Sequence, residues 1–124
     1  MDKKAKKVLV LEDEETLGNL YCNKLSEAGF DVTYCKTLAE LLSVYESFRP
    51  DVAFLDYVLY GESQSGSNAI PLLKESNPDI KIIMLSNLDE FSMEKKEGEE
   101  ALAYLRKIDT SPAALASYAK SLFA

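Results

Sequence analysis

The sequence predicts an α/β fold, in which one doubly wound parallel sheet of five strands carries five helices on its two faces. Two observations lead to this prediction. Short apolar segments alternate along the chain with segments whose apolar residues recur at helical spacing. The clearest strand candidates are apolar on both faces, as strands covered by helices on both sides are. A chain of 124 residues can bury one such core, so we expect residues 1–124 to form a single domain.

The first half of the chain contains three predicted strands and two predicted helices. The segment VLVL, residues 8–11, is apolar on both faces and predicts the first strand. Apolar residues at helical spacing follow it, and Gly29 ends this helix before the alternating segment 30–34. Thr37 is the expected N-cap of the second helix, and residues 52–55 form the third predicted strand.

The second half of the chain repeats the alternation after a polar loop. Its predicted elements are a loop at 60–68, a helix through Ile70 and Leu73, a strand at 80–86, a helix at 90–96, a strand at 101–105 and a last helix. The strand at 80–86 has the strongest signal because it is rich in Ile and bounded by polar residues. Ser111 as N-cap and Pro112 as first residue mark the start of the last helix.

Composition excludes several classes of function. The formal net charge of −7 argues against direct nucleic-acid binding, which needs clustered basic residues. The basic residues near the N-terminus are expected to be a solvated tail: Lys3, Lys4, Lys6 and Lys7. No run is long and apolar enough for a membrane span, and Cys22 and Cys35 lie too far apart for a metal motif. We therefore expect a cytoplasmic protein without a membrane partner and with ordinary thiols.

Polar side chains follow the predicted strands where they end. These are Glu12 and Asp13 after the first strand, Asp56 after the third, Ser86 at the end of the fourth and Lys107 after the fifth. Parallel sheets of this type bind ligands at the carboxyl ends of their strands, so we expect these side chains to meet. Three carboxylates at one edge repel one another unless a cation lies among them. A site that offers a small number of hard oxygen ligands is suited to Mg²⁺.

Together these residues predict phosphoryl transfer. A carboxylate held beside a metal, here Asp56, can attack phosphorus. The metal and Lys107 would neutralise the phosphoryl oxygens, and Ser86 would donate a hydrogen bond to one of them. Taken singly, each has an ordinary explanation as a cap, a polar strand end or a surface lysine, and only the set points to chemistry. Glu14 and Glu15 are expected to favour the positive end of the first helix.

In order and approximate spacing these residues resemble the site of a response-regulator receiver domain of two-component signalling systems. The resemblance rests on the pair Glu12 and Asp13 after VLVL, Asp56 in FLDYVL, Ser86 in IIMLS and Lys107 in YLRK, and it covers nearly the whole chain. It implies a flavodoxin-like sheet of strand order 2-1-3-4-5 and Mg²⁺ as cofactor. It also implies that the backbone carbonyl of Val58 is a metal ligand and that Ser86 and Tyr104 are switch residues.

The function that the resemblance implies is a phosphorylatable signalling switch. Asp56 would accept a phosphoryl group from a partner phosphohistidine, carried by a sensor histidine kinase or by the phosphotransfer protein of a phosphorelay. The domain would catalyse its own phosphorylation and dephosphorylation, with no separate substrate turned over. A downstream effector protein, or a second copy of the chain, would bind the face made of the fourth helix, fifth strand and fifth helix. Several residues depart from the usual pattern. Ile108 and Tyr60 each stand where a proline is common, Asn87 replaces a small residue, and Glu100 stands where a glycine usually precedes the fifth strand.

Other functions remain open at this point. A degenerate receiver would act as a protein-interaction module without phosphorylation, although the full set of acids, hydroxyl and lysine weighs against this. A hydrolase of the haloacid-dehalogenase type also uses an Asp nucleophile and Mg²⁺, but it needs a second Asp where Val58 stands. A flavodoxin-like electron carrier needs a phosphate-binding loop after the first strand, where this chain has acids.

Overall fold

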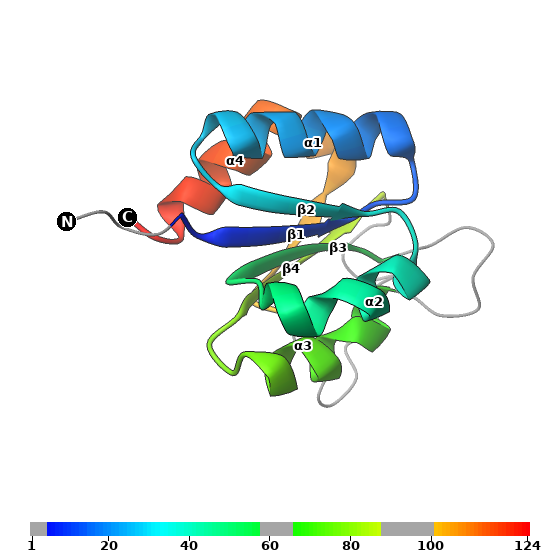
Figure 1. The fold of residues 1–124 in the computed structure, drawn as a ribbon. Coiled ribbons are helices and arrows are strands. Elements are labelled where there is room, and N and C mark those ends of the chain that lie inside the picture. Colours follow the sequence, from blue (N-terminus) through cyan, green and yellow to red (C-terminus); the bar gives the residue numbers. More distant parts are fainter. Residues whose placement is uncertain (1–4, 58–65, 88–100) are drawn as a thin grey trace.

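The computed structural model describes residues 5–57, 66–87 and 101–124, and a parallel sheet of five strands lies at its centre (Figure 1). The strands are β1 (Lys7–Leu11), β2 (Asp31–Cys35), β3 (Val52–Asp56), β4 (Lys81–Ser86) and β5 (Ala103–Arg106). Their order in the sheet is β2-β1-β3-β4-β5, and every neighbouring pair is parallel. The predicted fold class and strand order are confirmed.

The helices form one layer on each face of the sheet. They are α1 (Glu15–Glu27), α2 (Leu38–Phe48), α3 (Ile70–Ser76) and α4 (Pro112–Ser121). Figure 1 shows α1 beside α4 on one face and α2 beside α3 on the other. The described residues thus contain four α-helices where the sequence predicts five, and the helix predicted at 90–96 lies outside the described residues.

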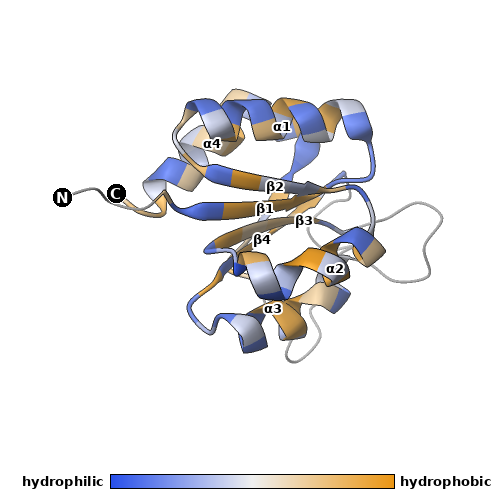
Figure 2. Cartoon of the chain, in the orientation of Figure 1, coloured by the Kyte–Doolittle hydropathy of each residue, from blue (hydrophilic) through white to orange (hydrophobic). Residues whose placement is uncertain are grey.

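Burial on both faces of the central strands holds these layers together. In β1, Val8 and Val10 pack against α1 and α4, whereas Leu9 and Leu11 pack against α2 and α3, and all four are fully buried. Figure 2 shows the same arrangement, with hydrophobic residues concentrated in the central strands between the two helical layers. The two cores explain why these strands are apolar at every position rather than at every second one.

The predicted ends of several elements are confirmed by local contacts. Glu14, Thr37 and Ser111 each accept a hydrogen bond from the backbone amide three residues later, at 3.0–3.1 Å. Gly29 follows α1 with a φ of 98°, a backbone conformation that residues other than glycine rarely adopt. β5 begins two residues later than the sequence predicts, at Ala103, which is its first residue in register with β4. Strand pairing depends on a neighbour that local sequence does not reveal.

The prediction of a solvated basic tail is wrong for Lys7, whereas Lys6 is exposed ahead of β1 as predicted. Lys7 is the first residue of β1, and its ammonium lies 5.9 Å from the ring centroid of Phe48. The ammonium of Lys6 lies 5.1 Å from the ring centroid of Phe123. Lys3 and Lys4 lie outside the described residues.

One further expectation from composition, that of ordinary buried or half-buried thiols, is met in the described part of the chain. Cys22 is half-buried and Cys35 is buried, and both thiols are free, as expected. Among the residues that the structure describes, no helix has the length and apolar character needed to cross a membrane.

Candidate functional site

The carboxyl ends of β1, β3, β4 and β5 bring the predicted site residues to one edge of the sheet. Register pairs Leu11 with Leu55 and Asp56 with Leu85, so the strands end nearly level with one another. Beyond the last pair of β3 and β4, the amide of Tyr57 donates to the carbonyl of Leu85 at 2.8 Å. Residues that follow these strands therefore share one rim, as the sequence predicts.

Three carboxylates meet at this rim. Glu12, Asp13 and Asp56 each place one carboxylate oxygen within 4.8 Å of the others. Glu12 and Asp56 are buried, with 0% and 2% of their surface exposed, whereas Asp13 is half-buried. Glu12 and Asp56 thus lie at the buried base of the cluster, and Asp13 lies toward solvent.

Lys107 is the cation that faces this cluster. Its Nζ lies 2.7 Å from Oε1 of Glu12 and 3.0 Å from Oδ2 of Asp56, and only 11% of its side chain is exposed. The 3₁₀ turn Lys107–Asp109 begins directly after β5, so the end of the strand positions this lysine. Among the described residues, one ammonium faces a cluster of three carboxylates, and this leaves an excess of negative charge that a divalent cation would balance.

The charge imbalance appears in the pKa values of the buried groups. Burial, followed by the negative charge of Glu12, raises the pKa of Asp56 to about 8, although Lys107 acts in the opposite direction. Burial tends to lower the pKa of Lys107, but its bond to Glu12 and the charges of Asp56 and Glu12 outweigh burial and raise this pKa. The lysine is therefore charged at neutral pH, and a second cation would help to keep Asp56 ionised.

A cavity opens beside Glu12, Asp13 and Lys107. Its volume is about 580 Å³, and it is lined by Glu12, Asp13, Glu14, Leu17, Asn87, Lys107 and Ile108. Ile108 is 76% exposed at its mouth. The cavity leaves room beside Lys107 and Asp13 for a small anionic group and a hydrated cation.

The remaining predicted site residues have different outcomes. Ser86 is buried at the end of β4, one residue beyond the partner of Asp56 in the sheet. Tyr104 is half-buried in β5 and packs against the core on the α2 and α3 side. The Val58 carbonyl and the helix expected to complete the output face lie outside the described residues. The metal, catalytic and switch roles of these residues stay predictions.

Gly66 and Tyr34 contact the site but were not predicted from the sequence. A Cβ built on Gly66 would overlap the carbonyl oxygen of Asp56, so only glycine fits against this part of the backbone. The hydroxyl of Tyr34 donates to the carbonyl oxygen of Glu12 at 2.7 Å. A glycine in a polar loop and an aromatic residue in a strand are common, and neither gave a signal of these contacts.

Comparison with known proteins identifies the family. The family model for the response regulator receiver domain matches residues 8–119. The chain belongs to this family. Receiver domains are the phosphorylation-dependent switches of two-component response regulators, so the resemblance stated from the sequence is confirmed at the level of the family.

Individual relatives and solved structures agree with this assignment. The probable transcriptional regulator ycf27 of Porphyridium aerugineum is 33% identical over 91 residues, which cover 69% of this chain and 35% of that protein. The BeF3-activated receiver domain of DrrB, a Thermotoga maritima protein, matches with a TM-score of 0.80 and 26% identity over 97% of this chain and 98% of that one. The response regulator CheY4 of Vibrio cholerae shares the fold, with a TM-score of 0.82 and 19% identity over 96% and 99% of the two chains. The matches span between 17% and 59% of the lengths of the curated relatives.

Proposed function

We propose that this receiver domain accepts a phosphoryl group on Asp56 from a partner phosphohistidine in a Mg²⁺-dependent reaction and then presents a changed surface to a partner. The observation that carries this proposal is the cluster of Glu12, Asp13 and Asp56. In it Lys107 contacts both Glu12 and Asp56, and an open cavity lined by Glu12, Asp13 and Lys107 lies beside it. The chain contains no histidine, so the donor phosphohistidine lies elsewhere.

The chemistry needs an ionised carboxylate and positive charge on the incoming oxygens. A carboxylate oxygen of Asp56 attacks phosphorus while the phosphorus–nitrogen bond of the donor breaks, and the imidazole keeps that electron pair and takes up a proton. Lys107, at 3.0 Å from Asp56, holds positive charge beside the phosphoryl group as it arrives. Ser86, at the end of the adjacent strand, would donate a hydrogen bond to a phosphoryl oxygen.

The oxygen ligands available at this site suit Mg²⁺. Three carboxylates in reach of one another provide hard oxygen ligands. In the described part of the chain one ammonium, that of Lys107, lies beside them, and it leaves negative charge for a divalent ion to balance. When bound, Mg²⁺ neutralises phosphoryl oxygens during transfer. Glu12, Asp13 and Asp56 would hold it, together with the carbonyl of Val58 that the resemblance implies.

Asp13 is expected to contribute more to Mg²⁺ affinity than Glu12. Both oxygens of Glu12 already have partners, since Oε1 faces Lys107 at 2.7 Å and Oε2 accepts the amide of Glu14 at 3.0 Å. Asp13→Asn should therefore weaken Mg²⁺ binding at least about tenfold, and Glu12→Gln by a smaller factor. Calorimetric titration of Mg²⁺ into both variants measures this. A loss in the Glu12 variant equal to or larger than that in the Asp13 variant would reverse the two roles.

The decisive experiment offers the wild-type chain a small acyl phosphate as donor. With Mg²⁺ we expect the intact mass to rise by one phosphoryl group, and with a chelator in place of Mg²⁺ we expect no rise. Labelling that ignores the removal of Mg²⁺ would contradict the metal-dependent reaction. A wild-type chain that binds Mg²⁺ and never gains mass would favour the alternative, a receiver that acts as an interaction module without phosphorylation.

Two kinds of partner follow from this function. A sensor histidine kinase or a phosphotransfer protein would supply the phosphoryl group in the cytoplasm. A downstream effector would bind the altered surface, and the name of ycf27, a probable transcriptional regulator, is consistent with such an output. By linkage, an effector that prefers the phosphorylated surface also favours phosphorylation. A second copy of the chain, bound through the face that includes β5, is the other proposed reader of the switch.

A further inference from the structure

The backbone amide and the backbone carbonyl of Glu12 both form hydrogen bonds with residues of β2. Its amide donates to the carbonyl of Cys35 at 3.1 Å, and its carbonyl accepts the hydroxyl of Tyr34 at 2.7 Å. The first of these bonds joins backbone to backbone at the end of β2, whereas the second depends entirely on one side chain. Tyr34 therefore holds the point at which β1 turns toward α1.

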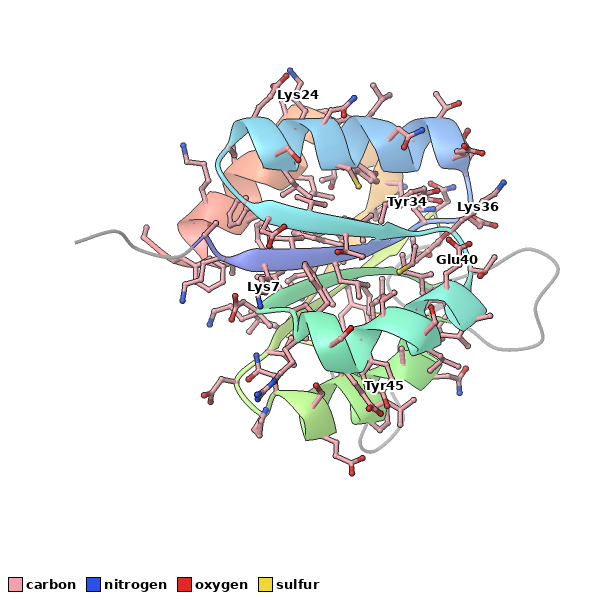
Figure 3. All side chains as sticks on the ribbon, in the orientation of Figure 1. Lys7, Lys24, Tyr34, Lys36, Glu40 and Tyr45 are labelled. Atoms are coloured by element: carbon pink, nitrogen blue, oxygen red, sulfur yellow. The ribbon has the colours of Figure 1, made fainter. Side chains whose placement is uncertain are left out.

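Gly18 in α1 makes room for this tyrosine. A Cβ built on Gly18 would lie 2.6 Å from Cζ and 2.8 Å from Oη of Tyr34, closer than van der Waals contact allows. Figure 3 labels Tyr34 on the α1 side of β2, at the end where β1 leads into α1. Glycine inside a helix is unfavourable compared with alanine. Here it lets the ring lie against α1 with its hydroxyl on Glu12.

The turn whose backbone bonds to Tyr34 is subject to electrostatic repulsion. It carries Glu12 and Asp13, whose carboxylates face Asp56, and like charges at this separation push the turn away from β3. Lys107 opposes this push at Glu12 but bonds only to its side chain. A hydrogen bond to the backbone of Glu12 resists the same movement from the opposite edge of β1.

We infer that Tyr34 is a positioning residue, whose hydroxyl keeps the turn after β1 closed so that the carboxylates of Glu12 and Asp13 stay in position for a cation. The contact is a long-range one, 22 residues apart in the chain, and it bears on the turn rather than on any reacting atom. The expected effect on cation binding rests on the function proposed above, whereas the effect on the turn does not.

Tyr34→Phe tests this inference, because it removes the hydroxyl and keeps the ring. We expect Mg²⁺ affinity, measured by titration calorimetry, to fall about three- to tenfold, as the loss of one hydrogen bond implies. We also expect faster hydrogen exchange at the amide of Glu14, which donates to the side chain of Glu12 across the same turn. Tyr45→Phe is the matched control, since it loses a hydroxyl bond to Glu46 at 3.1 Å on the distant helix α2.

Gly18→Ala tests the same contact without changing the tyrosine. The added methyl group displaces the ring, so the loss of Mg²⁺ affinity and the faster exchange at Glu14 should recur even though alanine favours the helix. Combined with Tyr34→Phe, it should cost little additional affinity, because both changes break one interaction.

Each result of these measurements decides the inference. Unchanged exchange at Glu14 and unchanged Mg²⁺ affinity in Tyr34→Phe would overturn it, including when the variant merely melts at a lower temperature. Phosphoryl uptake by the wild-type chain tests the proposed function separately. If the wild-type chain neither binds Mg²⁺ nor gains mass, the proposed function fails, and exchange at Glu14 alone decides whether Tyr34 holds the turn.

Discussion

Asp56→Asn is expected to abolish the mass gain with an acyl phosphate and Mg²⁺. Asparagine has nearly the same shape and fits the end of β3, but its amide oxygen is a far weaker nucleophile than a carboxylate. The loss should be complete within the detection limit of intact mass measurement, because Asp56 is the carboxylate that lies 3.0 Å from Lys107 and within 4.8 Å of the carboxylates of Glu12 and Asp13.

The control for this variant is Asp51→Asn at the other end of the same strand. Asp51 precedes β3, is half-buried and accepts the amide of Lys7 at 2.8 Å, so it loses a comparable charge far from the cavity. It should label like the wild type. Thermal unfolding in chelator shows whether Asp56→Asn is folded, and its midpoint should equal or exceed that of the wild type, since one of three repelling carboxylates is gone. A labelled Asp56→Asn chain would show that another residue accepts the phosphoryl group.

Lys107→Met is expected to slow labelling about a hundredfold or more. Methionine keeps much of the length of the side chain but removes the ammonium that lies 2.7 Å from Glu12 and 3.0 Å from Asp56. A preorganised positive group aimed at developing charge contributes on the order of a hundredfold to a thousandfold in rate. The rate of mass gain at fixed acyl phosphate and Mg²⁺ concentrations measures the effect.

The neighbouring residue provides a matched control for the lysine. Arg106→Met also removes one positive charge from the end of β5, but Arg106 is exposed and faces Asp109 at 3.6 Å rather than the cavity. It should label at nearly the wild-type rate. If the two variants were slowed equally, the loss of general positive charge would explain the result and the specific role of Lys107 would be wrong.

The lysine variant also has an expected cost in stability. Removing one member of a buried ion pair leaves its partner uncompensated and costs roughly 3 kcal/mol in the free energy of unfolding. Adding Glu12→Gln to Lys107→Met should recover part of this loss, because the nearer of the two carboxylates left without the lysine is then neutral. Urea unfolding of the single and double variants in chelator checks this. A double variant less stable than the single one would mean that Glu12 is held mainly by its bond to the amide of Glu14.

Much of the fold could be predicted because the relevant signals are local. The segments at 8–11 and 52–55 are apolar at every position, which identifies strands buried on both faces and hence a doubly wound sheet. Ser111 followed by Pro112 is a helix start that depends only on backbone groups within one turn. By contrast, the start of β5 depends on its pairing with β4, and Lys7 in β1 looked like part of a tail.

The sequence by itself determined which chemical groups reach the rim of the sheet. A residue directly after a buried parallel strand must lie at the carboxyl edge, so Glu12, Asp56 and Lys107 were predictable as neighbours from strand positions alone. Only the tertiary structure decided how these groups are held: the two oxygens that Lys107 contacts, the glycine against the backbone of Asp56, and the Tyr34 hydroxyl on the carbonyl of Glu12. Such contacts join side chains to backbone atoms far away in the chain, and their existence depends on ångström-level packing between elements that no local pattern encodes.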